Sequence, residues 1–171
     1  MANHRHQVLH LKPWNPNIRV QRAAFDLNQE TRGLTAGRTD IGAVVAFTGW
    51  CRDEGERLAA LELEHYPGMA EAEIARIAAA AADRWPLQGL TIIHRYGRIV
   101  PGKPIVLVLT ASEHRQAAFE AAAFLMDYLK TRAPFWKKER TAMGTRWVDA
   151  RATDDIAAER WRPPFGSRLG R

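Results

Sequence analysis

The sequence predicts an α+β fold, in which two main helices pack on a mostly antiparallel sheet. Helical periodicity extends from Met69 to Trp85 and again from His114 to Arg132. Around these stretches, short segments rich in β-branched and aromatic residues are separated by the turn signals Pro101-Gly102 and Met143-Gly144, which are typical of hairpins. Strands joined largely by hairpins, together with two long helices, are typical of the α+β class.

The expected strands either alternate apolar and polar side chains or form continuous apolar runs. They are Ile18–Leu27, Ile41–Arg52, Leu61–Tyr66, Leu90–Val100, Ile105–Thr110, Phe135–Arg140 and Thr145–Arg151. We expect Asn28–Asp40 to be a short helix or a loop, Asp53–Arg57 to be an exposed loop, and Asp154–Trp161 to be a short helix.

Both main helices have an expected buried stripe and an expected end. The stripe residues are Met69, Ile74, Ile77, Ala81 and Trp85 in the first helix, and Phe119, Ala122, Met126 and Leu129 in the second. Pro86 ends the first helix, and Ser112 is the expected N-cap of the second. Pro134 disfavours a helical Ala133, so the chain should leave the second helix there.

Length and composition favour one domain in a reducing compartment. A chain of 171 residues with 46% hydrophobic residues can bury about two-thirds of its unfolded surface in one core, expected at residues 18–161 between tails at 1–17 and 162–171. The single cysteine, Cys51, excludes an intrachain disulfide. No signal peptide or apolar membrane span of roughly 20 residues is evident, which predicts a cytoplasmic protein. Neither a metal nor another cofactor is expected.

The charge pattern points to an anionic partner. The net charge is +6 and the sequence pI is about 10.0, which fits a phosphate ester, an acidic protein or a nucleic acid. The stretch DYLKTRAPFWKKE, residues 127–139, here called the lysine segment, places Lys130 near a helix end and Lys137 on the following strand. Period-two alternation puts Lys137 on one face with Phe135 and Glu139. If Lys130 approaches Lys137, charge repulsion and partial desolvation would favour loss of a proton from one amine.

Two further places carry candidate anion-binding side chains. Arg52 ends a predicted strand and could bind a phosphate or carboxylate bidentately, although an isolated arginine there would more often be solvated. His114 and Arg115 open a helix, where free N–H groups and the helix dipole already favour an anion.

Helix length predicts that these residues form a composite site. Arg115 and Lys130 are 15 residues apart, about 22 Å along a helix at about 1.5 Å per residue. One small substrate cannot span that distance. A single site using both helix ends must therefore combine two subunits, which predicts a twofold dimer.

Several segments together resemble the large, catalytic subunit of molybdopterin synthase. They are GAVVAFTGWCR (Gly42–Arg52), LELEHYPGMAE (Leu61–Glu71), HRYGRIVPG (His94–Gly102), SEHRQAAFEAAAFLMDYLKTRAPFWKKE (Ser112–Glu139) and RWVDAR (Arg146–Arg151). The resemblance extends in order from about Ile18 to Trp161, and the lysine segment with the preceding His-Arg pair is its most specific part.

The resemblance implies an α/β-hammerhead fold and a sulfur transferase of molybdenum cofactor biosynthesis. Such an enzyme takes sulfur from the C-terminal thiocarboxylate of a small ubiquitin-like subunit and converts cyclic pyranopterin monophosphate, or precursor Z, into the dithiolene of molybdopterin. The implied assembly is a heterotetramer around a large-subunit dimer. The residues that match the family's catalytic positions are Lys130 and Lys137, and those that match substrate-binding positions are Arg52, His114, Arg115, Lys138, Glu139, Phe47, Met126 and Arg151.

Two other function classes fit parts of the sequence. A nucleic-acid-binding module fits the pI, but the basic residues are dispersed and no RNA-binding signature is present. A non-catalytic scaffold for an ubiquitin-like partner would bind the small subunit without turnover. Cys51 beside Arg52 raises a persulfide hypothesis, against which strand alternation directs Cys51 away from the face of Arg52. We therefore interpret Cys51 as a small apolar strand residue.

Overall fold

The computed structural model describes residues 15–53, 55, 57–148 and 152–161. The strands are β1 (Asn17–Gln21), β2 (Ala43–Trp50), β3 (Leu58–His65), β4 (Leu87–Arg95), β5 (Gly97–Ile99), β6 (Pro104–Ser112), β7 (Phe135–Thr141) and β8 (Gly144–Val148). The helices are α1 (Leu27–Thr35), α2 (Met69–Arg84), α3 (Arg115–Arg132) and α4 (Ala152–Glu159). The α+β prediction is confirmed, since β1 and β4 form the only parallel pair among the described strands. Apart from residues 15–17, the expected tails lie outside the described residues.

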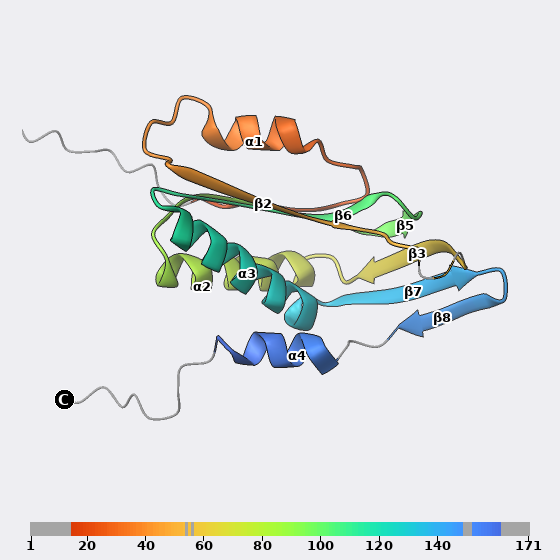
Figure 1. The fold of residues 1–171 in the computed structure, drawn as a ribbon. Helices are drawn as coiled ribbons and strands as arrows, with labels where there is room; N and C mark the ends of the chain where they lie inside the picture. The colour runs from red at the N-terminus through yellow and green to blue at the C-terminus, as the bar shows by residue number, and fades with distance from the viewer. Residues whose placement is uncertain (1–14, 54, 56, 149–151, 162–171) are drawn as a thin grey trace, which may run out of the picture.

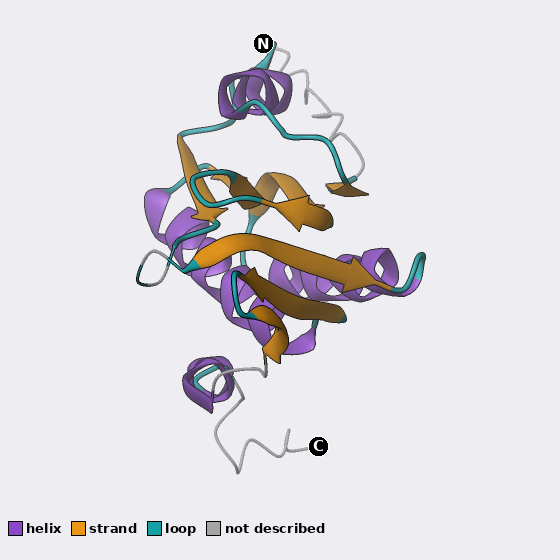
Figure 2. Ribbon diagram, turned by 90° about the vertical axis from the view of Figure 1, so that its right-hand side faces the viewer, coloured by secondary structure: helices purple, strands orange, loops and turns teal. Residues whose placement is uncertain are grey.

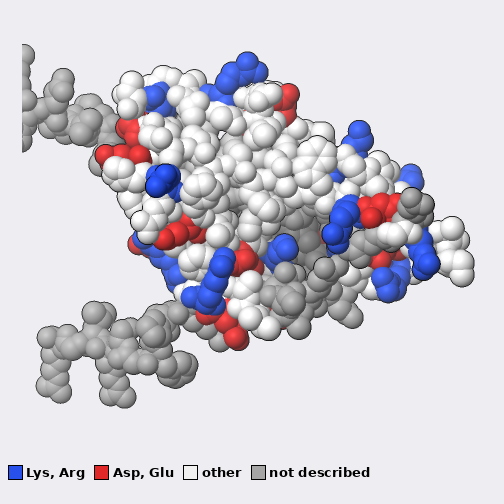
Figure 3. Space-filling model, in the orientation of Figure 1, with Lys and Arg blue, Asp and Glu red and all other residues white. Residues whose placement is uncertain are grey.

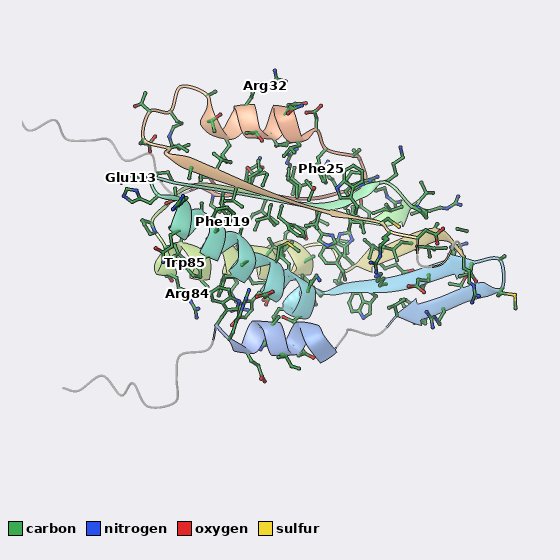
Figure 4. All side chains as sticks on the ribbon, in the orientation of Figure 1. Phe25, Arg32, Arg84, Trp85, Glu113 and Phe119 are labelled. Atoms are coloured by element: carbon green, nitrogen blue, oxygen red, sulfur yellow. The ribbon has the colours of Figure 1, made fainter. Side chains whose placement is uncertain are left out.

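The first sheet has the strand order β1-β4-β6-β2 and is covered on both faces. In Figures 1 and 2, α1 lies on one side of this sheet, and α2 and α3 lie on the other. Alternation along β4 explains the two cores: Ile92 packs in the cluster with α2 and α3, whereas Ile93 packs toward Phe25 and Leu34 on the α1 side. Figure 4 shows Phe25 between α1 and the sheet. No described helix is long and apolar enough to cross a membrane.

The second sheet has the order β5-β3-β7-β8 and extends beyond one end of the first (Figure 1). Its own buried cluster contains Cys51, Leu61, Leu63 and Ile99. Ile105 of β6 packs against both this cluster and the main core, so the two sheets share a continuous apolar boundary. Since β7 follows α3 after only two residues, the lysine segment lies where the helical layer meets the second sheet.

The predicted strand Leu90–Val100 is wrong as a single element, because it divides between the two sheets. Tyr96 interrupts it, and its N–H donates to O of Gln21, the last residue of β1, at 3.1 Å. Gly97 then adopts φ 83°, a conformation that favours glycine and redirects the chain into β5. β4 still pairs with β6 as the predicted hairpin, while β5 pairs with β3.

The predicted strand Ile18–Leu27 also needs correction, because β1 ends at Gln21. Asp26 instead caps α1, since its carboxylate accepts a hydrogen bond from Gln29 N at 2.8 Å. The polar stretch that could have been a helix or a loop is thus a short helix.

The predicted cap and stripe of the second main helix were partly wrong. Ser112 belongs to β6, where its buried hydroxyl donates to Pro86 O at 2.9 Å, and His114 takes the N-cap position. Phe119 is 62% exposed because α3 presents a row of alanines to the sheet instead. The helix α3 lies close to β6, because Thr110 Oγ1 of β6 donates a hydrogen bond of 2.7 Å to Ala118 O of α3. In α2, Met69 was likewise expected in the buried stripe but is 52% exposed.

The residues that follow α4, Arg160 and Trp161, contact α3 through the Asp127 carboxylate and through ring packing. Asp127 accepts a hydrogen bond from Trp161 Nε1 at 2.7 Å and forms an ion pair with Arg160 at 2.6 Å. The Trp161 ring packs edge-on against Trp85 and Phe124. Asp127 opens the lysine segment, so these contacts fix the part of α3 that carries Lys130.

Candidate active site

Strand pairing divides the side chains of β7 between two faces of the second sheet. Phe135, Lys137 and Glu139 lie opposite His65, Leu63 and Leu61 of β3. Directly opposed residues of an antiparallel pair share a face, and Leu61 and Leu63 are buried. The predicted grouping of Lys137 with Phe135 and Glu139 is therefore confirmed, and it lies on the inner face.

On the inner face of β7, Lys137 and Glu139 lie near the buried side chain of Cys51. The Cys51 side chain is 3% exposed, and its Sγ lies 3.7 Å from Ile99 O. Burial raises the pKa of the Cys51 thiol, and the nearby ammonium of Lys137 acts in the opposite direction with a smaller effect. Arg52 follows directly and is exposed at the end of β2. The structure thus brings Lys137, Glu139 and the Cys51-Arg52 pair to one corner of the molecule.

Replacing Cys51 with alanine should leave the sulfur-transfer activity that the resemblance implies intact. A buried thiol with a raised pKa is a poor thiolate nucleophile, so it is not expected to carry sulfur. We expect the turnover number to stay within about twofold of wild type, with stability reduced by about 1 kcal/mol for the atoms removed from the small core cluster. Steady-state kinetics and urea unfolding measure both quantities. An inactive but folded variant would contradict this assignment.

Lys130 and Lys137 flank the predicted chain reversal. α3 ends at Arg132, and Ala133 has an extended backbone (φ −67°, ψ 126°), as expected for a residue before proline. The Phe135 N–H then donates to Ala133 O at 2.8 Å and tightens the turn. Lys130 is an exposed residue in the last turn of α3, and Lys137 is the partly buried third residue of β7.

The other residues predicted to line or support the pocket come from three different elements, α3, β2 and β7. Met126 is one turn before Lys130 and packs against the main core. Phe47 of β2 is 38% exposed, so it presents an aromatic surface at an edge of the first sheet. Glu139 is held by Arg146 of the neighbouring strand β8, with Nη2 2.8 Å from Oε2.

Lys138 does not join Lys137, since it projects from the opposite face of β7. Its ammonium lies 2.5 Å from Glu64 Oε1 and 4.0 Å from the centre of the Trp147 ring. The next outer residue, Arg140, pairs with Glu62 in the same way. Lys138 was expected to bind substrate. In this chain, its side chain instead stabilises the outer face of the second sheet.

His114 and Arg115 lie at the far end of α3 from the lysines (Figure 1). The helix is unbroken over its 18 residues, so the expected separation of about 22 Å holds. Both side chains are exposed, and His114 makes no side-chain cap hydrogen bond. Within one chain, the structure does not bring them together with Lys130 and Lys137. Arg151, the remaining predicted site residue, lies outside the described residues.

Gly42 positions the segment that carries His114 and Arg115. Its N–H donates to Ser112 O at 3.1 Å, and a Cβ at this glycine would lie only 2.1 Å from Glu113 O. A hollow of about 340 Å³, lined in part by Gly42 and Glu113, lies beside this turn and away from Lys137.

Gly42→Ala should therefore displace the turn before α3. The clash involves backbone, so we expect a loss of about 1–3 kcal/mol in the free energy of unfolding and weaker anion binding at His114 and Arg115. Gly33→Ala in α1 is the matched control, because nothing lies within 4 Å of its Cβ position and alanine favours a helix. Urea unfolding and phosphate titration test both variants. Equal behaviour of the two would refute the tight approach at Gly42.

A cluster of rings at the start of β7 was not recognised as part of the site from the sequence. His94 of β4 stacks on Phe135, with ring centres 3.8 Å apart and an interplanar angle of 14°. His65 lies 6.0 Å from Phe135 and 4.3 Å from Tyr96. The available signal was a histidine that continues the apolar row of Leu90 and Ile92 in β4.

His94 should make the stability of the protein fall in mild acid. Burial lowers its pKa from 6.5 to about 4, His65 adds to this effect, and the hydrogen bond at Arg95 O opposes it. The fold thus favours the neutral ring, whereas the unfolded chain takes up a proton below about pH 6.5. The contribution of His94 is complete above that pH and is lost as the pH falls toward 4, amounting to about 3 kcal/mol at about 1.4 kcal/mol per pH unit.

Urea unfolding of wild type and His94→Phe between pH 7 and 4.5 measures this effect. We expect wild type to lose stability more steeply, because the phenylalanine variant has no proton to take up at this position. Parallel pH dependences would show that His94 does not titrate as described.

Comparison with known proteins places this geometry in a family. The MoaE protein family model matches residues 20–132. A relative in Mesorhizobium japonicum is 66% identical over 149 residues, which is 86% of this chain and 94% of that protein. The solved MoaE protein from Burkholderia ambifaria is 52% identical, with a TM-score of 0.75, and the match covers 86% of this chain and 98% of that one. The solved molybdopterin synthase from Staphylococcus aureus is 30% identical, with a TM-score of 0.70. That match covers 76% of this chain and 95% of the Staphylococcus aureus chain.

The chain belongs to the MoaE protein family. Its Mesorhizobium japonicum relative carries the name molybdopterin synthase catalytic subunit, in agreement with the resemblance in the sequence.

Proposed function

We propose that this chain is the catalytic subunit of a molybdopterin synthase. It transfers sulfur from the C-terminal thiocarboxylate of a small ubiquitin-like subunit to cyclic pyranopterin monophosphate and so forms the molybdopterin dithiolene. Family membership supports the reaction class. The observation that carries the site is the placement of Lys130 and Lys137 on the two sides of the turn at Pro134, with Lys137 on the inner face of its sheet.

The two lysines supply the charge that this reaction requires. Attack of the thiocarboxylate sulfur on the pterin side chain displaces an oxygen, which needs a proton donor and electrostatic stabilisation. Lys137 is partly buried beside Glu139 and the Cys51 cluster, so its ammonium acts in a less polar environment than an exposed lysine would. Lys130, exposed at the helix end, is suited to stabilising charge on the substrate. The sulfur arrives already activated, so this scheme uses no metal or redox cofactor.

The substrate phosphate is bound by Arg52 together with His114 and Arg115 of a second subunit. The first turn of α3 adds backbone N–H groups that are not capped by His114. A second copy of this chain is required because α3 keeps the two ends of the site about 22 Å apart within one chain. Phe47, Met126, Glu139 and Arg151 would line or support the pocket.

The exposed surface favours this dimer. Phe119, expected in the core, is 62% exposed on α3, and Phe47 is exposed on the edge strand β2. Figure 3 shows a largely uncharged surface along β2 and the neighbouring side of α3, with charges toward its margins. A self-complementary apolar patch of this kind is what a twofold interface uses. With two small subunits, the assembly is a heterotetramer, and we place it in the cytoplasm.

The alternatives receive no support from the described surface. Lys138, Arg140 and Arg146 each pair with a glutamate, so these three basic residues of the second sheet do not form an open phosphate-binding stripe. A non-catalytic scaffold would leave the inward placement of Lys137 without a role.

The test is reconstitution of the reaction. The purified chain is mixed with a thiocarboxylated small subunit and precursor Z, and the dithiolene product is quantified. We expect turnover by wild type and none above background without the thiocarboxylate. Binding of the small subunit without product would identify a scaffold instead.

A further inference from the structure

The ring cluster of His94, Phe135, His65 and Tyr96 lies between the two sheets, beside the site already described. β4 contributes His94 from the first sheet, and β3 and β7 contribute His65 and Phe135 from the second. Of these contacts, only that between His94 and Phe135 is a close parallel stack. It therefore connects the main core to the first residue of β7.

The His94 ring is itself held on a fixed part of the fold. Its Nδ1 lies 2.9 Å from Arg95 O, which a neutral ring satisfies by donating from Nδ1. The Arg95 side chain donates to Arg22 O at 3.1 Å and to Pro104 O at 2.7 Å, and so ties the end of β4 to neighbouring segments. His94 is thus supported by backbone contacts that do not depend on β7.

Phe135, by contrast, follows a short connection. Only Ala133 and Pro134 separate it from the end of α3, and Lys137 is two residues further on the same face. Two strand residues span about 7 Å, so a shift of the Phe135 ring passes almost directly to Lys137. Pairing with β3 and β8 holds Lys137 along the strand, and the Phe135 ring adds the contact that ties the start of β7 to the main core.

We propose that His94 is a positioning residue for sulfur transfer, whose ring stacks on Phe135 and fixes the start of β7 so that Lys137 meets the substrate held by Lys130 and Arg52. This role rests on the proposed function. It is distinct from a metal site, since no group of three or more potential His, Cys, Asp or Glu ligands occurs among the described residues. It also goes beyond filling the core, because the parallel stack supplies a defined orientation that an aliphatic side chain cannot.

Two substitutions separate stacking from burial. His94→Phe keeps a flat ring against Phe135, whereas His94→Leu keeps an apolar side chain but removes the stack, and both lose the hydrogen bond to Arg95 O equally. Ile92→Val, which trims the same row of β4 but leaves both rings of the His94–Phe135 stack in place, controls for a general loss of stability. All three are studied in the assembled enzyme with thiocarboxylated small subunit and precursor Z.

We expect His94→Leu to lower kcat by about 10- to 100-fold, because displacement of a catalytic group by about 1 Å has effects of this size. KM for precursor Z should remain within about twofold, since the proposed phosphate ligands lie elsewhere. His94→Phe should retain kcat within about threefold of wild type. Equal kcat values for the Phe and Leu variants, or a Leu variant no worse than Ile92→Val, would overturn the positioning role.

Hydrogen exchange tests the His94–Phe135 stack in a way that does not depend on turnover. The β7 amides from Phe135 to Lys137 should exchange faster in His94→Leu than in His94→Phe, while those of β6 remain alike. If wild type produces no dithiolene, the proposed function fails, and the exchange data still decide whether the stack fixes β7. Equal exchange in the two variants would refute the stack as the fixing contact.

Discussion

Lys137→Ala should reduce dithiolene formation by about 100- to 10,000-fold, the range of a lost general acid or base. Lys137 is the lysine of β7 that faces inward, beside Glu139 and within electrostatic reach of Cys51. Removing it takes away the ammonium at the point where the chain returns from α3, and no other described residue of that face of β7 is a cation. Single-turnover measurement with the thiocarboxylated small subunit follows the chemical step directly.

Lys138→Ala is the matched control for this variant. It removes the same charge from the adjacent position, but from the outer face, where Lys138 binds Glu64 and covers Trp147. We expect a modest loss of stability, below about 1 kcal/mol for an ion pair at the surface, and a rate near wild type. If Lys138→Ala lost as much rate as Lys137→Ala, the claim that only the inner face of β7 serves catalysis would be wrong.

Arg115→Ala should weaken binding of precursor Z by about 10- to 100-fold, as expected for a lost charge-assisted hydrogen bond to phosphate. Arg115 is exposed at the N-terminus of α3, where it serves no visible purpose in stabilising the helix. The loss should appear in KM and in equilibrium binding of the substrate more than in the single-turnover rate at saturation. Arg32→Ala on α1 removes an exposed arginine remote from the site and should have no such effect (Figure 4). An unchanged affinity in Arg115→Ala would exclude this end of the helix from the site.

Much of the fold followed from local signals in the sequence. The helix-ending effect of Pro134 and the period-two placement of Lys137 depend on neighbouring residues only, and the structure agrees with both. The hairpin predicted at Met143-Gly144 also forms, but its turn lies one residue earlier, at Ala142-Met143. The division of Leu90–Val100 between two sheets could not be foreseen, because it depends on Gln21 and on pairing with β3, which are distant in sequence. The exposure of Phe119 likewise depends on how closely the alanines of α3 approach β6.

Around the candidate site, the local geometry followed from the sequence, whereas the contacts between distant segments did not. Alternation placed Lys138 opposite Lys137, but only the structure shows that Glu64 and Trp147 engage it. His94 was visible as a polar member of an apolar row, yet its stack on Phe135 requires the two sheets to meet. The distance between Arg115 and Lys130 was predictable from helix geometry alone, because a continuous helix has a fixed rise.

Mixing two impaired variants tests the composite site most directly. Lys137→Ala and Arg115→Ala subunits are dissociated, combined in equal amounts and reassembled with the thiocarboxylated small subunit. In a mixed dimer, one site receives both substitutions, and the other receives an intact Lys137 from one subunit and an intact Arg115 from the other. With about half of the dimers mixed and one active site in each, we predict recovery of about a quarter of wild-type activity at a precursor Z concentration too low for Arg115→Ala alone to turn over. Activity no higher than the average of the two separate variants would contradict a site built from two subunits.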